Sequence, residues 1–251
     1  MPGWVQAGGW GLLAGSALLL GAAVGYLVHI PAKVVASVMA FGAGVLLSAV
    51  SFELIAEAYD QGGLRPTALG AIAGSLVYTG CNVLLARRGA RHRKRSGDQQ
   101  PSEGDQGGSG TALAMGALLD GVPESVVIGT SLLGGGVVSA VTVAAVFISN
   151  VPEGLSSSAG MRRAGRPAGY VFGVWGGIAL ISGVAAVAGY TLLGGASPAV
   201  LAAITALAAG AILTMVADTM IPEAFEDTHL AIGLITLTGF LTAFALSRLG
   251  E

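Results

Sequence analysis

Long apolar runs separated by short polar links dominate the chain. A helix needs roughly 20 apolar residues to cross the hydrocarbon core of a bilayer. The pattern predicts one helix in each of these ranges: 10–28, 34–58, 66–86, 111–133, 137–160, 168–193, 198–225 and 229–248. The sequence therefore predicts an all-α integral membrane protein, with eight transmembrane helices in a single transmembrane domain over residues 1–251.

One long polar segment interrupts this pattern. Residues 87–110 are first basic and then rich in Gly, Ser and Gln. Such a composition cannot bury enough apolar surface to fold by itself. We therefore expect a flexible loop between the third and fourth helices.

Composition agrees with a membrane chain. The 251 residues are 53% hydrophobic and 10% charged, whereas soluble domains carry about 25% charged residues. The net charge of −2 gives no indication of a nucleic-acid partner. The single cysteine, Cys81, excludes an intramolecular disulfide. The first residues hold no Lys or Arg, so we expect the first run to be a retained helix rather than a secretory signal.

The basic residues divide unevenly between the two sides of the membrane. With eight crossings both termini share one side, and only Arg65 and Arg248 fall there. The ten others share the opposite side: Lys33, Arg87, Arg88, Arg91, Arg93, Lys94, Arg95, Arg162, Arg163 and Arg166. Cytoplasmic loops carry the excess of Lys and Arg. The sequence therefore predicts a multi-pass protein of the plasma (inner) membrane, with both termini outside and loop 87–110 in the cytoplasm.

Glycine pairs with GxxxG spacing predict close helix packing. They are Gly21/Gly25, Gly70/Gly74 and Gly173/Gly177. All three pairs lie inside predicted helices.

The second and seventh runs end alike. Ile55-Ala-Glu-Ala-Tyr-Asp60 and Ile221-Pro-Glu-Ala-Phe-Glu226 share the pattern Ile-x-Glu-Ala-aromatic-acid. The second run crosses outward and the seventh crosses inward, so the match predicts inverted repeats of three helices each. Transporters often have this construction, with the substrate site near the midplane between the repeats.

Several carboxylates lie inside the apolar runs. Asp120, Glu124 and Glu153 lie well within them, whereas Glu53, Glu57, Asp218 and Glu223 lie within or near the ends. A charged carboxylate at the centre of a bilayer costs at least roughly 2–3 kcal/mol. No Lys or Arg sits inside a run to neutralise them, since Arg248 only ends the last one. A bound cation, a proton or water must therefore compensate these charges.

The fourth and fifth runs hold the densest polar set. Asp120 and Glu124 are four residues apart and share a helix face, and Ser149 and Glu153 repeat this spacing. Pro123 and Pro152 lack an N–H group, so each frees the carbonyl four residues earlier. Together these groups predict a cation site. The alternative is that the prolines only kink the helices and the acids are buried in protonated form.

This pair of motifs resembles the ZIP family of divalent metal transporters. That family carries His-Asn-x-Pro-Glu-Gly in its fourth helix and a similar motif in its fifth. The resemblance extends over nearly the whole chain and implies eight helices in a 3+2+3 arrangement, both termini outside and a long cytoplasmic loop after the third helix. It implies that the metal ligands are Asp120 and Ser149 at the two His positions, with Asn150, Glu124 and Glu153 retained.

The chain departs from the family in ways that affect metal choice. Gly121 stands at the fourth-helix Asn position, and the sixth-helix Glu of two-metal members is absent from Ser182-Gly-Val-Ala-Ala-Val187. Zinc favours His and Cys, whereas oxygen donors suit harder ions such as Mn²⁺. The expected cargo is therefore Zn²⁺, Mn²⁺ or Fe²⁺, with no enzymatic activity and no prosthetic group.

We expect the cation to pass between the second, fourth, fifth and seventh helices. Glu53, Glu57, Asp218 and Glu223 are candidates for where it enters and leaves, as are Asp60, Glu226, Asp227 and His229; solvated helix ends are the alternative. Two other functions remain open. They are a proton-conducting or proton-coupled carrier without metal and a degenerate regulatory membrane subunit. The partners expected are the metal ion and the lipid bilayer, and a homodimer is left open.

Overall fold

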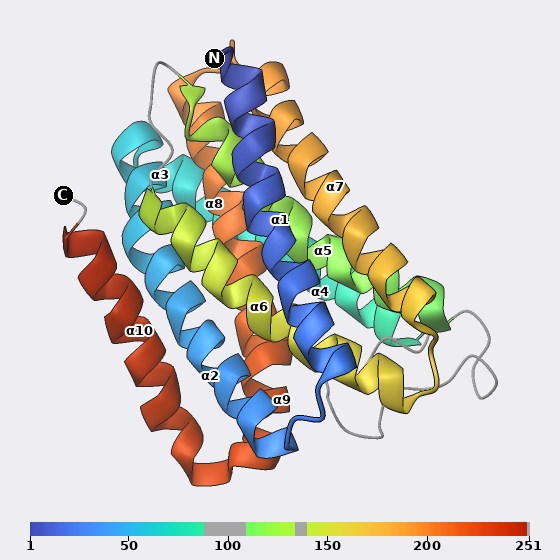
Figure 1. The fold of residues 1–251 in the computed structure, drawn as a ribbon. Coiled ribbons are helices and arrows are strands. Elements are labelled where there is room, and N and C mark those ends of the chain that lie inside the picture. The colour runs from blue at the N-terminus through green and yellow to red at the C-terminus, as the bar shows by residue number, and fades with distance from the viewer. Residues whose placement is uncertain (88–108, 134–139, 250–251) are drawn as a thin grey trace.

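The protein folds as a bundle of helices (Figure 1). The computed structural model describes residues 1–87, 109–133 and 140–249. The α-helices in these ranges are α1 (Gly3–Leu27), α2 (Ala32–Ala49), α3 (Ile55–Gly62), α4 (Leu64–Leu85), α5 (Ser109–Thr130), α6 (Ala140–Arg163), α7 (Ala168–Leu193), α8 (Pro198–Met215), α9 (Ile221–Thr228) and α10 (Ile232–Leu249). Two π-helical segments, Val50–Leu54 and Val216–Met220, join α2 to α3 and α8 to α9 without a break. The expectation of an all-α protein is confirmed for this part of the chain.

Each apolar run contains a helix, but several boundaries differ from those expected. α1 begins at Gly3 rather than residue 10, because its glycine-rich start packs on α7. A Cβ at Gly11, for example, would come within 2.8 Å of the carbonyl oxygen of Ser182. Hydropathy misses such a segment because glycine contributes backbone contact rather than apolar side chains. The expected loop 87–110 lies mostly outside the described residues, although α5 already includes Ser109 and Gly110.

Several helices are long and apolar enough to cross a membrane. Five meet this description within the described residues: Gly3–Leu27, Ala32–Gly62, Leu64–Leu85, Ala168–Leu193 and Pro198–Glu226; Ile232–Arg248 is a shorter apolar helix. α4 directs large apolar side chains outward, with Leu69 and Leu76 each 68% exposed. Such a surface suits lipid contact. The architecture is compatible with a multi-pass membrane protein.

The described basic residues gather at one end of the bundle. α1 begins and α10 ends toward the same end (Figure 1). Arg65 and Arg248 belong to helix ends on that side. The opposite end carries Lys33 at the start of α2, Arg87 after α4, and the arginines between α6 and α7. The charge asymmetry expected from the sequence is therefore present between the two ends.

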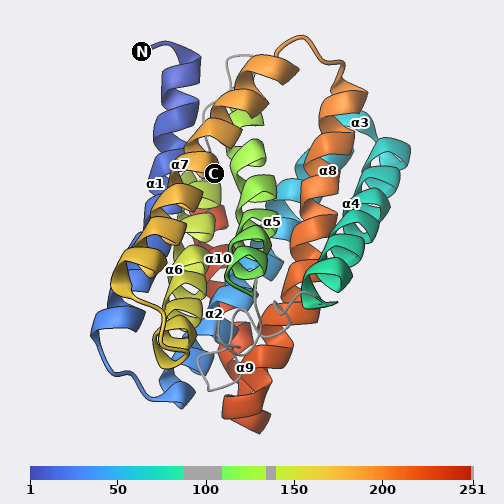
Figure 2. The ribbon, with the colours of Figure 1, turned by 90° about the vertical axis from the view of Figure 1, so that its right-hand side faces the viewer.

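The helices form two groups (Figure 2). In the first helix group α1 packs on α6 and α7, and α5 packs on α7. In the second, α4 packs on α8, α10 packs on α2, and α3 and α9 pack on α8 and α2 respectively. The groups meet mainly where α2 lies against α6 and α5 against α8.

Glycines bring backbones together inside each group. A Cβ at Gly21 or Gly25 of α1 would overlap the backbone of α6, and one at Gly70 or Gly74 of α4 would overlap the backbone of α8. The first two GxxxG predictions are therefore confirmed. The third is wrong for the part of the chain that the structure describes, where nothing lies within 4 Å of a Cβ at Gly173 or Gly177. Spacing alone does not tell which face of a helix meets a neighbour.

The second and seventh runs share one architecture. Each is an α-helix of 18 residues, a π-helical segment of 5 and an α-helix of 8. Both segments keep the same offset, from Val50 to Val216 and from Ile55 to Ile221 (216 − 50 = 221 − 55 = 166). They run in opposite directions, since α3 lies at the upper end and α9 at the lower end of Figure 1.

The packing partners repeat with the helices. A Cβ at Gly44 of α2 would overlap the Thr236 carbonyl of α10, and one at Gly210 of α8 would overlap the Ala71 carbonyl of α4. These contacts match, because Gly44 and Gly210 are themselves 166 residues apart (210 − 44 = 166). The structure therefore supports the inverted relation between these two helix pairs.

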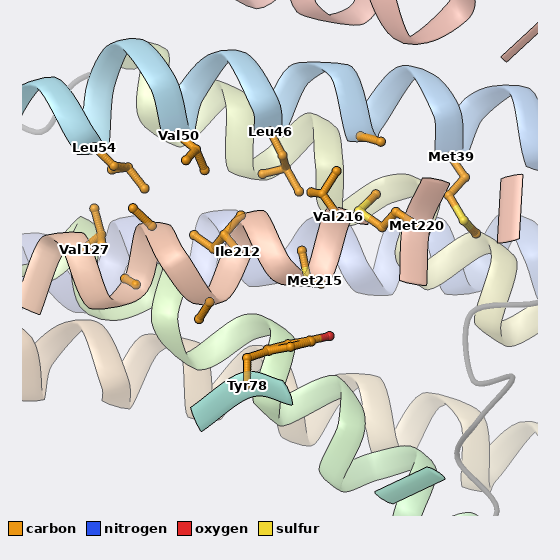
Figure 3. Packing of buried hydrophobic residues seen from close by; sticks show 14 of the residues in the cluster. Met39, Leu46, Val50, Leu54, Tyr78, Val127, Ile212, Met215, Val216 and Met220 are labelled. Carbon is orange, nitrogen blue, oxygen red and sulfur yellow. The ribbon is translucent and has the colours of Figure 1, made fainter. Parts of the chain in front are cut away.

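A core of large side chains fills the space between α2 and α8 (Figure 3). It includes Met39, Leu46 and Val50 from one side and Ile212 and Met215 from the other. The first helix group reaches this core through Val127 of α5.

Candidate cation site

The five predicted ligands are all buried. The exposed fraction is at most 5% for each of Asp120, Glu124, Ser149, Asn150 and Glu153. Asp120 and Glu124 come from α5 and the other three from α6, and each helix continues through its proline. The carbonyls of Leu119 and Ile148 still lack the N–H four residues later, because Pro123 and Pro152 have none. Carboxylate, amide and backbone oxygens thus occur on the same two helices.

Asp120 is bonded across the two helix groups. The hydroxyl of Tyr78 on α4 donates a hydrogen bond of 2.8 Å to Oδ1 of Asp120. Tyr78 is 1% exposed and belongs to the core between α2 and α8. The Asp120 carboxylate is therefore held from the second helix group although its own helix belongs to the first.

The two polar residues at the centre of α6 are also oriented. Asn150 donates from Nδ2 to the Ala14 carbonyl of α1 at 3.0 Å. This bond uses an amide hydrogen, so the amide oxygen keeps its lone pairs. Ser149 donates its hydroxyl to the Val146 carbonyl at 2.9 Å and keeps its oxygen as an acceptor. Both side chains can therefore still offer oxygen to a cation.

The Pro-Glu segment of α6 faces the second helix group. A Cβ at Gly42 of α2 would lie 2.7 Å from Cγ of Pro152 and 3.6 Å from Cα of Ser149. Gly42 thus makes room for this segment at the boundary between the groups. Val127, three residues after Glu124, meets the second group on α5.

The carboxylates do not form a compact cluster in this structure. In the described part of the chain, no three His, Cys, Asp or Glu side chains are grouped so as to hold a metal ion. A cation bound here would therefore also need the amide, hydroxyl or backbone oxygens, or a movement that draws the carboxylates together.

A cavity of about 250 Å³ opens between the groups at the end where α3 lies. Its polar lining includes Glu57 and Gln61 from α3, Thr130 and Ser131 near the end of α5, and Thr205 from α8. Gln61 donates a hydrogen bond of 2.8 Å to the Glu57 carboxylate. One of the predicted points of ion passage therefore lines a polar cavity.

The other candidates for ion passage lie in different surroundings. Glu223 on α9 is buried, and Asp218 is exposed within its π-helical segment. Glu53 accepts a hydrogen bond from the hydroxyl of Ser247 and so faces α10. Asp60 and Glu226 are exposed, and the side chains of Asp227 and His229 lie outside the described residues. Among the acids whose side chains the structure describes, no three are grouped.

Sequence reasoning missed Tyr78 and the π-helical segments. Tyr78 is one aromatic residue in an apolar run, and its hydrogen bond to Asp120 distinguishes it. The π-helical segments have no sequence pattern that identifies them. The constant spacing between the two copies of the repeated helix was nevertheless present in the sequence. No protein-family model matches this chain, and no curated protein matches it.

Proposed function

We propose that this protein carries divalent metal cations across a membrane, as a ZIP-type transporter with eight transmembrane helices in a 3+2+3 arrangement. The observation that carries the proposal is the burial of five oxygen-bearing side chains on α5 and α6, inside apolar runs without Lys or Arg. Intramembrane carboxylates are costly and typically mark ion pathways. The repeated architecture of the second and seventh runs adds support, because transporters commonly bind substrate between inverted repeats.

The donor set favours harder ions in this proposal. Asp120, Glu124 and Glu153 supply carboxylates, while Ser149 and Asn150 supply neutral oxygens. Oxygen ligands suit Mn²⁺, whereas sites rich in thiolate or imidazole ligands select zinc. We therefore expect Mn²⁺ or Fe²⁺ to be carried at least as well as Zn²⁺.

The cation would travel along the boundary of the two helix groups. The helix pairs inside each group are held by backbone contacts at glycine, whereas Gly42 meets the ring of Pro152 at the boundary. Contacts made by side chains can be exchanged more easily than interlocked backbones. We propose that one group rocks against the other, with Glu57 in the cavity on the outer route and Glu223 on the inner one.

In this proposal the basic end faces the cytoplasm and both termini face outward, in the plasma (inner) membrane. The positive-inside rule is the support. A glycosylation or cysteine-labelling tag fused before α1 tests it, because only an outward terminus is modified from outside intact cells.

Uptake into proteoliposomes tests transport itself. Mn²⁺ and Zn²⁺ uptake by the wild type is expected to saturate, and Glu124→Ala or Glu153→Ala to reduce it at least about tenfold, the lower range for losing a group that positions or binds a metal. Glu103→Ala, in polar segment 87–110, is the control and should leave uptake unchanged. Unchanged uptake in both site variants would show that the assigned site is wrong. Proton flux without metal flux would favour the carboxylate relay instead.

A further inference from the structure

Tyr78 connects the candidate site to the opposite helix group. Its hydroxyl donates a 2.8 Å hydrogen bond to Asp120, 42 residues away in the chain. The donor and acceptor are both buried, at 1% and 3% exposure. Hydrogen bonds with a carboxylate acceptor are among the stronger ones in proteins, and burial keeps water from replacing them.

The Tyr78 ring is fixed to the second helix group. Figure 3 shows it on the side of α8 that faces away from α2, and it belongs to the same hydrophobic core as Ile212 and Met215. Its helix α4 is locked to α8, since Cβ atoms at Gly70 and Gly74 would overlap the α8 backbone. A tyrosine has only two rotatable side-chain bonds, so packing of the ring also fixes the direction of the hydroxyl. When the second group moves, the hydroxyl must move with it.

Asp120 is fixed to the first helix group in the same way. α5 approaches α7 so closely that a Cβ at Gly129 would overlap the carbonyl of Ala186. Gly121, next to Asp120, also lies against α7, where a Cβ would be 3.7 Å from Oγ of Ser182. The Tyr78–Asp120 bond therefore joins a helix packed in the second group to a helix packed in the first.

We propose that Tyr78 is a positioning residue that turns the Asp120 carboxylate toward the cation and makes the affinity of the site depend on the relative position of the helix groups. The inference rests on the proposed function. The phenol engages Oδ1 of the carboxylate and so fixes the orientation of the Asp120 side chain. Partners that orient a ligating carboxylate typically change metal affinity about 10–100-fold. A shift between the groups removes the donor, so the cation is held more weakly in the other arrangement. Differential affinity of this kind lets a ligand shift a conformational equilibrium.

Calorimetric titration of the purified full-length protein with Mn²⁺ tests this role. Tyr78→Phe removes only the hydroxyl, and we expect the Kd to rise about tenfold. Tyr26→Phe is the matched control, because the Tyr26 hydroxyl bonds the Arg166 carbonyl within the first helix group, at 3.2 Å. Its Kd should equal that of the wild type. In proteoliposomes Tyr78→Phe should raise the KM for Mn²⁺ with little change in the maximal rate.

A double variant distinguishes positioning from packing. If Tyr78 acts through Asp120, Tyr78→Phe/Asp120→Ala should bind no more weakly than Asp120→Ala alone. Additive losses would overturn the inference, as would a Tyr78→Phe protein with wild-type Kd. Asp120→Glu moves the acceptor and leaves the ring packing intact, so it serves if Tyr78→Phe fails to fold. It should weaken binding, and wild-type affinity there would also overturn the inference. A wild type that binds no Mn²⁺ would instead overturn the proposed function, and this inference with it.

Discussion

The two copies of the repeated helix end in different surroundings. Glu57 follows the first π-helical segment and lines a cavity of about 250 Å³. Glu223 occupies the matching position after the second segment, yet it is only 8% exposed. Its neighbour Ala224 is fully buried in the core, as Ala58 is buried beside Glu57. The sequence motif is the same in both copies. The difference lies in how far the neighbouring helices cover its glutamate.

This contrast indicates that the structure is in an asymmetric conformation, although the two copies of the repeated helix share one architecture. Helices α3 and α9 pack on α8 and α2, so the helix that carries each acid packs on the 18-residue helix of the other copy. If the first helix group moved toward α3, the cavity at Glu57 would close. Two conformations related by exchange of the repeats are the general basis of alternating access.

The largest expected effect comes from the glycines that hold the repeats to their partners. Gly44→Ala and Gly210→Ala would each drive a methyl group into a carbonyl oxygen, so we expect both to lower the free energy of unfolding by about 1–3 kcal/mol, as overpacking does. Thermal unfolding in detergent measures the loss. Gly177→Ala is the control, since nothing lies within 4 Å of its Cβ. If the variants at positions 44 and 210 are as stable as the control, the two repeats are not held to their partners in the same way.

Thiol reactivity should sharpen the contrast between the two acids. In a Cys81→Ser background, a cysteine in place of Glu57 should react with a polar maleimide at least about tenfold faster than one in place of Glu223, because the minor conformation is populated to about 10% or less. Detergent solution exposes both ends, so the sidedness of the membrane does not enter. Glu226→Cys, exposed at the same end as Glu223, should react rapidly. Equal rates at positions 57 and 223 would contradict an asymmetric state.

The smallest expected effect concerns a bond made by one repeat alone. Ser247 donates to Glu53, whereas the equivalent of Glu53 in the second repeat, Thr219, bonds the Met215 carbonyl of its own helix. Ser247→Ala should therefore lower the free energy of unfolding by about 1 kcal/mol. Thr242→Ala on α10 is the control, because Thr242 bonds only the Thr238 carbonyl within the helix. A Ser247→Ala protein as stable as the control would show that Glu53 does not depend on this bond.

Much of the fold could be predicted because hydropathy and length decide where helices form in a membrane chain. The limits of that reasoning are visible at α1, whose start is too rich in glycine to register as apolar. They recur at Gly173 and Gly177, where spacing was right but the helix face was wrong. Tertiary packing selects the face, and a single sequence does not contain it.

The burial of the candidate residues could be predicted, but their hydrogen bonds could not. Pro-Glu spacing singled out Glu124 and Glu153, and both are buried. The bond from Tyr78 to Asp120 could not be foreseen, because it joins residues on helices of different groups. The absence of three grouped acids in the described residues was likewise outside the reach of spacing, which fixes neighbours along one helix only.

Anomalous scattering from crystals soaked in Mn²⁺ or Zn²⁺, recorded at two wavelengths, tests the central claim most directly. The account predicts one peak between α5 and α6, with carboxylate oxygens of Glu124 and Glu153 about 2.0–2.6 Å away, the range for divalent cations bound by oxygen. The change between wavelengths identifies the element. No peak beside these two residues in protein that takes up metal, or a peak elsewhere in the bundle, would contradict the account.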